Sequence, residues 1–260
     1  MANWIIVKKK LKKFNKTISV NGDKSISIRW VLFSSLASGK SKAKNLLISD
    51  DVIAGIRAIK KFGIKTSFKN EEHTIYGKGI NGYKYKKNLT INLHNSGTLG
   101  RLLLGILINT PYPIKLIGDK SLSKRDFKRV ASPLSKFGAK FILSNGKGLP
   151  LRIFGSPKLK PINYFENKGS AQCKSSVIFA GMRSNGLTTI KAKKSRNHTE
   201  ILCKYLKLPI SIKKTTKFDE IKIKKVKKIK ILNYNIPSDI SSSAFFIVLT
   251  ALNQNSKLVI

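Results

Sequence analysis

The sequence predicts an α/β protein built from repeated units of strands and helices. Segments with the alternating apolar pattern of strands recur between apolar segments long enough to form helices. Their order repeats with a period of about 70 residues, and self-similarity of this kind indicates a repeat architecture. Residues 62–65 (Phe-Gly-Ile-Lys) and 137–140 (Phe-Gly-Ala-Lys) occupy the same place in two successive copies. Each copy is predicted to run strand, helix, strand, helix, strand, strand.

The first copy opens with a turn followed by the start of a helix. Residues 21–23 (Asn-Gly-Asp) are a turn signal, and Ser25 is a candidate N-cap. The helix is predicted to begin near Ser25 and to end near Gly39, a C-terminal signal. Lys24 lies at its mouth, and Arg29 follows about one turn along on roughly the same face. Because a helix N-terminus favours anions, the two cations indicate a phosphate or carboxylate site. The simpler alternative is an ordinary capped helix with solvated cations.

The remaining predicted elements follow in the same order. The first copy also contains strands 5–13 and 16–20 before its helix, and then strand 41–47, helix 52–62 and strands 64–68 and 74–76. The second contains a helix opened by residues 95–98 and ending at 108, strand 114–117, helix 127–137 and strands 139–143 and 151–154. The third contains a helix opened by residues 169–172 and ending at 182, strand 187–192, a helix opened by residues 195–200 and ending at 206, and strands 210–213 and 221–231. A fourth begins with helix 244–252 and a strand from residue 257. If the copies pack around a pseudo-threefold axis, the cations near their helix starts face one cleft: Lys24, Arg29, Arg101 and Arg125.

The charge of the chain favours anionic partners. Its 260 residues carry a formal net charge of +40, which suits phosphorylated small molecules, nucleic acid or a membrane surface. Lysine greatly outnumbers arginine, and Ile and Asn are abundant throughout, which indicates a compositional bias over the whole chain. The basic residues do not form one stripe, and no zinc-finger spacing, aromatic RNA-binding signature or heptad occurs. We therefore expect no specific nucleic-acid partner.

Cysteine, histidine and apolar runs give no support for a metal, a disulfide or a membrane. Cys173 and Cys203 each lie in an apolar helical context and are expected to be buried, and the three histidines are scattered. The apolar start of the chain is short and precedes its lysines, the wrong order for a signal peptide. No apolar run is long enough to span a membrane. We expect a cytoplasmic protein with no metal site.

Six short motifs occur in order along nearly the whole chain. They are residues 23–29 (Asp-Lys-Ser-Ile-Ser-x-Arg), 95–101 (Asn-Ser-Gly-Thr-x-x-Arg), 122–125 (Leu-x-Lys-Arg), 170–175 (Ser-Ala-Gln-x-Lys-Ser), 195–200 (Ser-Arg-x-His-Thr-Glu) and 237–242 (Pro-x-Asp-Ile-Ser-Ser). Together they resemble the motifs of the enolpyruvylshikimate-phosphate synthase family. One such motif alone is a weak signal, whereas six in order are specific.

The resemblance implies a fold and a reaction. The fold is an enolpyruvyl transferase-like, inside-out α/β barrel of two lobes. Each lobe holds three strand–helix units whose helix N-termini face the cleft between the lobes. The reaction moves the enolpyruvyl group of phosphoenolpyruvate to the 5-hydroxyl of shikimate 3-phosphate and releases phosphate, a step of aromatic amino-acid biosynthesis in the shikimate pathway. No cofactor is implied, and we expect a monomer. Because both substrates carry phosphate and carboxylate groups, clustered cations should position them and stabilise charge.

The resemblance also implies roles for particular residues. Lys24 and Arg125 are the expected catalytic residues, and Lys24 resembles the contact shared by the two substrates. The other expected contacts with shikimate 3-phosphate are Ser25, Arg29, Ser170, Ala171, Gln172, Ser195 and Arg196. Gly97 would let the backbone approach phosphoenolpyruvate, Arg125 would clamp it, and Arg101 would act in support. Without the motif set, the serines are plain N-caps, Gly97 is a turn glycine and the arginines are structural.

Two positions depart from the family's pattern. Ile28 stands where the family often has histidine, at a position peripheral to the anion contacts. Asp126 replaces the proline that usually follows the arginine of the third motif. Its carboxylate either pairs with Arg125 and weakens the grip on phosphoenolpyruvate, or caps the following helix.

The motifs divide the chain into one complete lobe and parts of another. Residues 20–235 are predicted to form a three-repeat lobe. Residues 1–19 and 236–260 are predicted to be strands and the start of the other lobe, poorly packed without their partners. The remaining motifs of that lobe, including its acidic residues and a lysine opposite Lys24, do not occur. We expect a truncated synthase that binds shikimate 3-phosphate weakly and shows no turnover.

Other functions remain open on the sequence alone. UDP-N-acetylglucosamine enolpyruvyl transferase shares the fold and the donor, but its opening motif carries Lys-Asn where this chain has Lys24 and Ser25. It also uses a reactive loop cysteine, whereas Cys173 and Cys203 lie in predicted helices. A basic nucleic-acid-binding protein is supported by the charge alone, and a structural remnant without activity is a further possibility.

Overall fold

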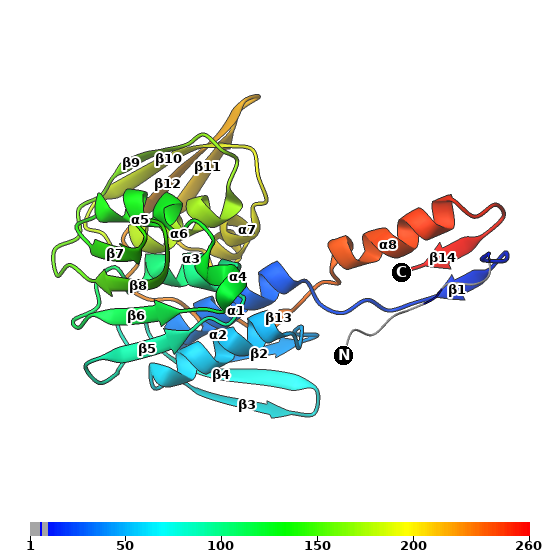
Figure 1. Ribbon diagram of the computed structural model, residues 1–260, viewed down its shortest axis with the longest axis horizontal. Coiled ribbons are helices and arrows are strands. Elements are labelled where there is room, and N and C mark those ends of the chain that lie inside the picture. The colour runs from blue at the N-terminus through cyan, green and yellow to red at the C-terminus, as the bar shows by residue number, and fades with distance from the viewer. Residues whose placement is uncertain (1–5, 7–9) are drawn as a thin grey trace.

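The computed structural model describes residue 6 and residues 10–260, which form a three-part body with one projecting segment (Figure 1). The first unit contains α1 (Lys24–Leu36), β2 (Ser38–Lys44), α2 (Asp50–Lys61), β3 (Lys65–Lys69) and β4 (Glu72–Lys78). The second contains β5 (Leu89–Asn92), α3 (Gly97–Leu107), β6 (Ile114–Ile117), α4 (Lys120–Ser123), α5 (Lys128–Ser135), β7 (Lys140–Ser144) and β8 (Gly148–Phe154). The third contains β9 (Asn163–Glu166), α6 (Ala171–Gly181), β10 (Leu187–Lys193), α7 (His198–Tyr205), β11 (Ile210–Lys214) and β12 (Phe218–Lys224). The elements outside these units are β1 (Asn15–Thr17), β13 (Tyr234–Asn235), α8 (Ile240–Ala251) and β14 (Lys257–Val259).

Each unit builds one four-stranded sheet, and the three sheets have the same topology. Their strand orders are β13-β2-β4-β3, β5-β6-β8-β7 and β9-β10-β12-β11. In each, the first pair is parallel and the next two pairs are antiparallel. The first unit takes its leading strand from β13, where Tyr234 pairs with Ala43 across most of the chain. The body is therefore closed, because its last strand completes its first sheet.

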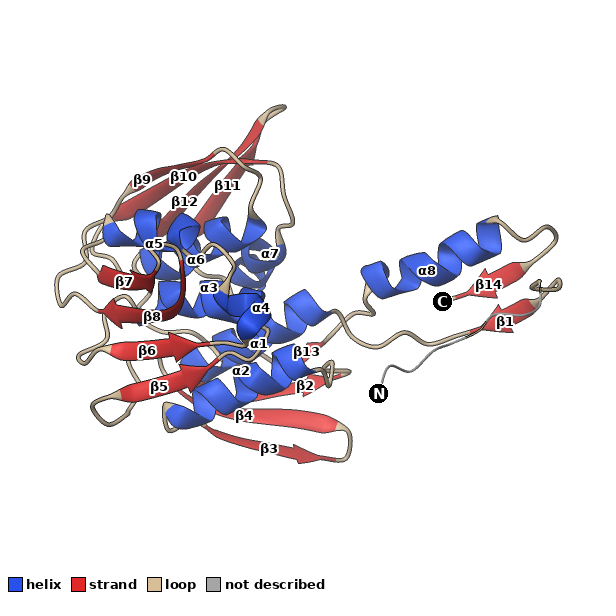
Figure 2. Ribbon diagram, viewed as in Figure 1, coloured by secondary structure: helices blue, strands red, loops and turns tan. Residues whose placement is uncertain are grey.

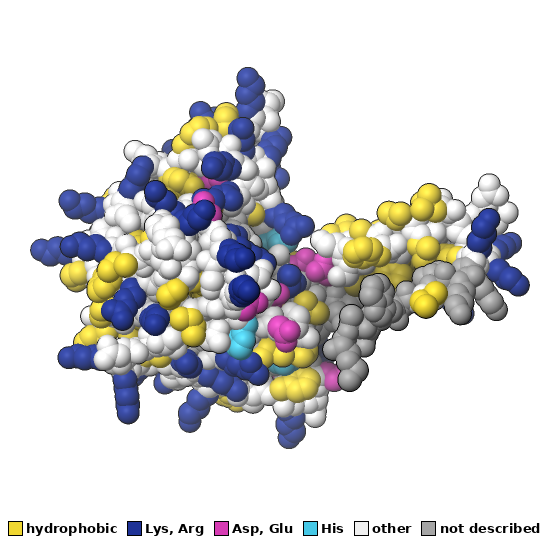
Figure 3. All heavy atoms as spheres, viewed as in Figure 1, with side chains coloured by type: hydrophobic (Ala, Val, Ile, Leu, Met, Phe, Trp, Pro, Cys, Tyr) yellow, Lys and Arg dark blue, Asp and Glu magenta, His cyan; other side chains and the backbone are white. Residues whose placement is uncertain are grey.

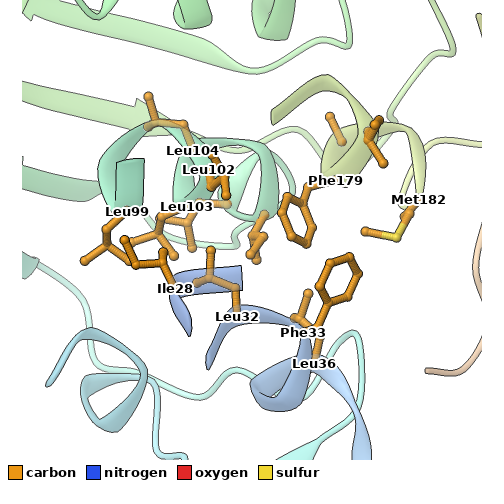
Figure 4. Packing of buried hydrophobic residues seen from close by; sticks show 14 of the residues in the cluster. Ile28, Leu32, Phe33, Leu36, Leu99, Leu102, Leu103, Leu104, Phe179 and Met182 are labelled. Carbon is orange, nitrogen blue, oxygen red and sulfur yellow. The ribbon is translucent and has the colours of Figure 1, made fainter. Parts of the chain in front are cut away.

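Helices lie inside the body and the sheets lie outside (Figure 2). The first helix of each unit, α1, α3 and α6, packs at the centre, where its residues are buried on all sides (Figure 4). Phe33 of α1 and Phe179 of α6 have ring centroids 4.8 Å apart. A Cβ added to Gly105 of α3 would lie 2.1 Å from Ser176 O of α6, so only glycine permits this approach. The three central helices consequently start close together at one end of the body.

The repeat predicted from the sequence is confirmed, with corrections to individual elements. Strand 5–13 is wrong where it can be tested, since residues 10–13 form no strand and residues 5 and 7–9 lie outside the described part. Strand 221–231 runs too far, because only Phe218–Lys224 pairs with neighbouring strands and residues 225–231 have no partner strand among the described residues. The leading strands β5, β9 and β13 and the short helix α4 were not predicted.

The projecting segment joins both ends of the described chain. β1 pairs with β14 in parallel, from Asn15 opposite Lys257 to Thr17 opposite Val259. α8 leads into β14 and exposes most of its apolar side chains, as Figure 3 shows along this part of the molecule. Two connecting loops link the segment to the body, and they touch where Asp23 N donates to Pro237 O at 2.8 Å. None of the described helices has the length and apolar character to cross a membrane.

Candidate functional site

One buried arginine links the first turns of three helices. From α1, Arg29 Nε donates to Thr199 Oγ1 of α7 at 2.7 Å, and Arg29 Nη2 donates to Ser175 Oγ of α6 at 3.2 Å. Arg29 Nη1 donates to Ser25 O at 2.9 Å, within the first turn of α1. We call Arg29, Thr199 and Ser175 the Arg29 cluster. It brings together the N-termini of α1, α6 and α7, as the predicted convergence of helix starts requires.

The two hydroxyl groups of the Arg29 cluster both donate their hydrogen bonds toward α6. Thr199 Oγ1 donates to Ser175 Oγ at 2.7 Å, and Ser175 Oγ donates to Ala171 O at 2.6 Å. Each hydroxyl therefore donates its single proton to an acceptor on α6, and its oxygen lone pairs accept from the guanidinium of Arg29. Three of the five N–H donors of Arg29 bond to Thr199, Ser175 and the carbonyl of Ser25. The other two N–H groups are available to a ligand.

Burial makes the charge of Arg29 costly. The side chain is almost fully buried, and burial lowers its pKa to about 10, although the Glu200 and Asp23 carboxylates favour the charged form. The cation of Arg196 acts in the same direction as burial. An anion bound beside these arginines would offset that cost, because an opposite charge stabilises the charged guanidinium.

Lys24 lies at the exposed start of α1. Its Nζ is 3.5 Å from Asp51 Oδ2 of α2, and its backbone N donates to Asp239 Oδ2 at 3.3 Å. The side chain is 48% exposed. Exposed ion pairs contribute little to stability, so the Lys24 ammonium can exchange Asp51 for an anionic ligand at small cost.

The loop before α6 is fastened by a buried carboxylate. Glu166 Oε2 accepts from Ser170 N at 2.7 Å, and Glu166 Oε1 accepts from Lys168 N at 3.2 Å. Ser170 Oγ in turn accepts from Cys173 N at 3.3 Å, so Ser170 is an N-cap of α6, as the simpler alternative held. The loop reaches the Arg29 cluster through Ala171, whose carbonyl ends the hydroxyl chain.

A second cluster lies at the start of α3. Arg125 Nη2 donates to Asn95 Oδ1 at 2.9 Å, and a Cβ on Gly97 would lie 3.2 Å from Arg125 Nη1. The guanidinium therefore lies over the first turn of α3, where glycine leaves room for it. Arg125 is exposed, so its remaining donors face solvent. This is a suitable place for a phosphate or carboxylate.

Arg101 connects the two clusters. Its Nη1 donates to Gln172 Oε1 of α6, its Nη2 donates to Asp126 O at 3.3 Å, and it lies 5.6 Å from the centre of the Phe127 ring. Gln172 Nε2 donates to Thr98 Oγ1 at 2.8 Å. Arg101 thus holds Gln172 in place rather than facing the solvent, which agrees with the supporting role expected for it.

Asp126 caps a helix in this structure. Asp126 Oδ1 accepts from Arg129 N at 3.2 Å in the first turn of α5. No ion pair joins Asp126 to Arg125, both of which lie in the described part of the chain. The geometry therefore favours Asp126 as a cap of α5 rather than as an ion-pair partner of Arg125. The donors of Arg125 are not taken up by Asp126.

The start of α7 holds polar atoms without partners. Within residues 10–260, Ser195 Oγ and His198 Nδ1 are buried and have no hydrogen-bond partner. Burial and the cations of Arg29 and Arg196 lower the pKa of His198, although Asp23 and Asp239 oppose the shift. Arg196 is exposed, and its Nη2 lies 3.5 Å from Ser241 Oγ at the start of α8. Unsatisfied buried groups next to free cations favour a polar ligand at this position.

The arrangement is suited to binding anions, because cations and helix N-termini lie close together. Except for Arg125, which lies between α4 and α5, the predicted site residues lie in the N-terminal parts of α1, α3 and α6 or in the loops before α6 and α7. No group of three His, Cys, Asp or Glu side chains able to hold a metal occurs among the residues described. Cys173 and Cys203 are buried in α6 and α7, and burial raises the pKa of both thiols, which leaves neither as a reactive loop cysteine.

Comparison with known proteins identifies the family. The family model for EPSP synthase (3-phosphoshikimate 1-carboxyvinyltransferase) matches residues 8–260. The chain belongs to the EPSP synthase family. A 3-phosphoshikimate 1-carboxyvinyltransferase of Caldicellulosiruptor bescii is 42% identical over 253 residues, covering 96% of this chain and 57% of that protein. One from Bacillus cytotoxicus is 37% identical over 251 residues, covering 96% and 58%.

A solved structure agrees with the sequence relatives. The EPSP synthase structure from Acinetobacter baumannii superposes with a TM-score of 0.85 at 33% identity, covering 95% of this chain and 55% of that one. The enolpyruvyl transferase fold expected from the motifs is thereby confirmed. The chain spans slightly more than half the length of the EPSP synthases it matches.

Sequence reasoning missed several residues that position the site. Ser175, Thr199, Lys174 and Glu200 lie inside the fourth and fifth EPSP synthase motifs, but no role was expected for them. Asn95 opens the second motif, and it orients Arg125. Glu166 lies outside the six motifs, and only its contacts with Lys168 N and Ser170 N reveal what it does.

Proposed function

We propose that this chain supplies one lobe of a 3-phosphoshikimate 1-carboxyvinyltransferase and binds shikimate 3-phosphate at the starts of α1, α6 and α7. The observation that carries the proposal is the Arg29 cluster, in which one buried guanidinium ties three helix N-termini together and keeps free donors. Helix N-termini and arginines favour the phosphate and carboxylate of this substrate. Membership of the EPSP synthase family supports shikimate 3-phosphate as the ligand of this site.

The individual roles follow the two clusters. Ser25, Arg29, Ser170, Ala171, Gln172, Ser195 and Arg196 are proposed to bind shikimate 3-phosphate. Arg125 and the Gly97 backbone are proposed to bind phosphoenolpyruvate, with Arg101 holding Gln172 between the two substrates. Lys24 lies at the mouth of α1 and is proposed to contact both substrates, stabilising the charge that develops as the enolpyruvyl group moves.

The reaction is proposed to need a second lobe facing this one. Residues 20–235 are proposed to form one lobe, and residues 1–19 and 236–260 are proposed to belong to the other. Two findings support this division. The chain matches only 55–58% of the length of its relatives, and α8 exposes Ile240 and Phe245 to solvent. We expect this chain to bind shikimate 3-phosphate weakly and to release no phosphate above background when both substrates are present.

Titration calorimetry of shikimate 3-phosphate into the chain tests the proposal. Shikimate and UDP-N-acetylglucosamine serve as ligand controls, and neither should bind at the concentration at which shikimate 3-phosphate does. Arg196→Gln should weaken binding about tenfold, since a charge-assisted hydrogen bond contributes roughly 1.5–3 kcal/mol. Arg152→Gln, an exposed arginine of β8 away from the site, is the matched control and should bind unchanged. Equal binding of shikimate and shikimate 3-phosphate would overturn the proposal.

A further inference from the structure

A fully buried ion pair lies directly behind the Arg29 cluster. Lys174 Nζ of α6 is 2.7 Å from Glu200 Oε1 of α7, and the two side chains are 0% and 3% exposed. Taking two charges out of water is costly, and well-packed apolar residues of similar volume often give equal or greater stability. Stability alone therefore does not explain why a charged pair occupies this place.

The pair is adjacent in sequence to both hydroxyls that hold Arg29. Lys174 precedes Ser175 on α6, and Glu200 follows Thr199 on α7. Ser175 and Thr199 are 2.7 Å apart and accept from the same guanidinium. A small displacement of α7 relative to α6 would break these bonds, because hydrogen bonds weaken steeply outside a narrow range of distance and angle.

The carboxylate of Glu200 pairs with the buried ammonium of Lys174 and also favours the charged form of Arg29. Its Oε1 pairs with Lys174, whereas its Oε2 has no hydrogen-bond partner within the described residues. Among the acidic groups near Arg29, Glu200 acts most strongly to favour the charged guanidinium, ahead of Asp23. The pair thus combines a mechanical link between α6 and α7 with a negative charge that compensates Arg29.

We propose that the Lys174–Glu200 pair is a positioning element that sets the spacing of the α6 and α7 first turns and so orients the Arg29 guanidinium toward an anion. Because both side chains are buried, neither residue is proposed to contact the ligand. The identity of the anion, shikimate 3-phosphate, rests on the function proposed above, whereas the orientation of Arg29 does not depend on it.

The test replaces the pair without leaving a lone buried charge. The variant Lys174→Met with Glu200→Leu keeps similar volumes, and the matched control is Lys42→Met with Glu72→Leu, at the half-exposed pair that is 2.6 Å apart on the first sheet. The first measurement is hydrogen exchange of Arg29 Nε–Hε by NMR, with its signal assigned from its loss in Arg29→Lys. We expect exchange at least tenfold faster in the site variant and unchanged in the control.

The second measurement is calorimetric affinity for shikimate 3-phosphate, expected to weaken about tenfold in the site variant and not in the control. Unchanged exchange at Arg29 in a folded site variant overturns the inference, whatever the affinity. If exchange rises as expected but even the unaltered chain does not bind shikimate 3-phosphate, the positioning role stands and the proposed function falls. Should the double variant fail to fold, Glu200→Gln, which keeps an acceptor for Lys174, undergoes both measurements with the same expected directions.

Discussion

α1 and α8 begin with similar caps, but α1 is buried in the body and α8 is largely exposed to solvent. Each is apolar, and each is capped by an aspartate: Asp23 Oδ1 accepts from Ile26 N at 2.7 Å, and Asp239 Oδ1 accepts from Ser241 N at 2.8 Å. Ten residues of α1 are buried, whereas Ser243 is the one buried residue of α8. The two helices share a local signal but differ in what packs on them.

This difference separates the formation of a helix from its stabilisation. Capping and apolar composition favour a helix in both places, but most helical stability comes from burying a face against neighbours. α1 has α2, α3 and the first sheet around it, while α8 has the short pair β1–β14. The body should therefore unfold cooperatively, and α8 should open locally at a lower free energy.

The largest effect is expected from matched phenylalanine truncations. Phe33→Ala removes a fully buried ring that packs 4.8 Å from Phe179, and it should lower the free energy of unfolding by about 3–5 kcal/mol. Phe245→Ala removes a ring of α8 that is 78% exposed, and its effect should stay within about 0.5 kcal/mol. Urea denaturation measures both, and similar losses in the two variants would contradict the comparison.

A smaller effect is expected from removing the two caps. Asp23→Ala should lower the global free energy of unfolding by about 1 kcal/mol, because α1 is part of the cooperative body. Asp239→Ala should remove protection from α8 amides and leave core amides unchanged. Native-state hydrogen exchange distinguishes the two, and loss of core protection in Asp239→Ala would show that α8 unfolds together with the body.

The smallest effect is expected from the titration of His198, at the start of α7. His198 has its pKa lowered from 6.5 by burial and by Arg29 and Arg196, so the unfolded chain binds its proton more readily than the folded chain. The contribution of His198 to stability is therefore present above pH 6.5 and is lost as the pH falls below it. Binding of shikimate 3-phosphate should raise this pKa, because an anion offsets the two arginines.

NMR titration of the imidazole signals measures this shift. His73, whose pKa is lowered by burial and which lies on β4 stacked on Phe68, is the internal control and should not respond to the ligand. An equal response of His73 and His198 would indicate non-specific anion binding to a highly cationic chain, and would remove His198 from the site.

Local patterns predicted most elements, and long-range pairing explains the ones they missed. β13 has two residues and exists because Tyr234 pairs with Ala43, a contact that no local pattern reveals. Beyond β12 the buried residues Val226 and Ile229 are three positions apart, so the alternation typical of a strand ends, and no described strand pairs with residues 225–231. Strand boundaries therefore depended on partners distant in the sequence, whereas helix starts were encoded beside the cap residues.

In the candidate site, too, local signals were predicted from the sequence, whereas contacts between distant residues were not. The motifs located the starts of α1, α6 and α7 to within a few residues, because caps and glycines are local signals, although the N-cap of α1 is Asp23 and not the predicted Ser25. They did not reveal that Arg29 bonds to Thr199, 170 residues away, or that Lys174 pairs with Glu200. These contacts arise from the packing of units that are adjacent only in the folded chain.

The central claim is that the first turns of α1, α6 and α7 form a half-site for shikimate 3-phosphate, and amide NMR mapping tests it most directly. Titrating the ligand into the labelled chain should move the backbone signals of Ser25, Ala171, Gln172, Ser195 and Arg196 together, with a single affinity. Signals of the lysines on the outer sheet strands, such as Lys191 and Lys222, should stay in place. Shifts confined to those outer strands, or spread evenly over the chain, would contradict the claim.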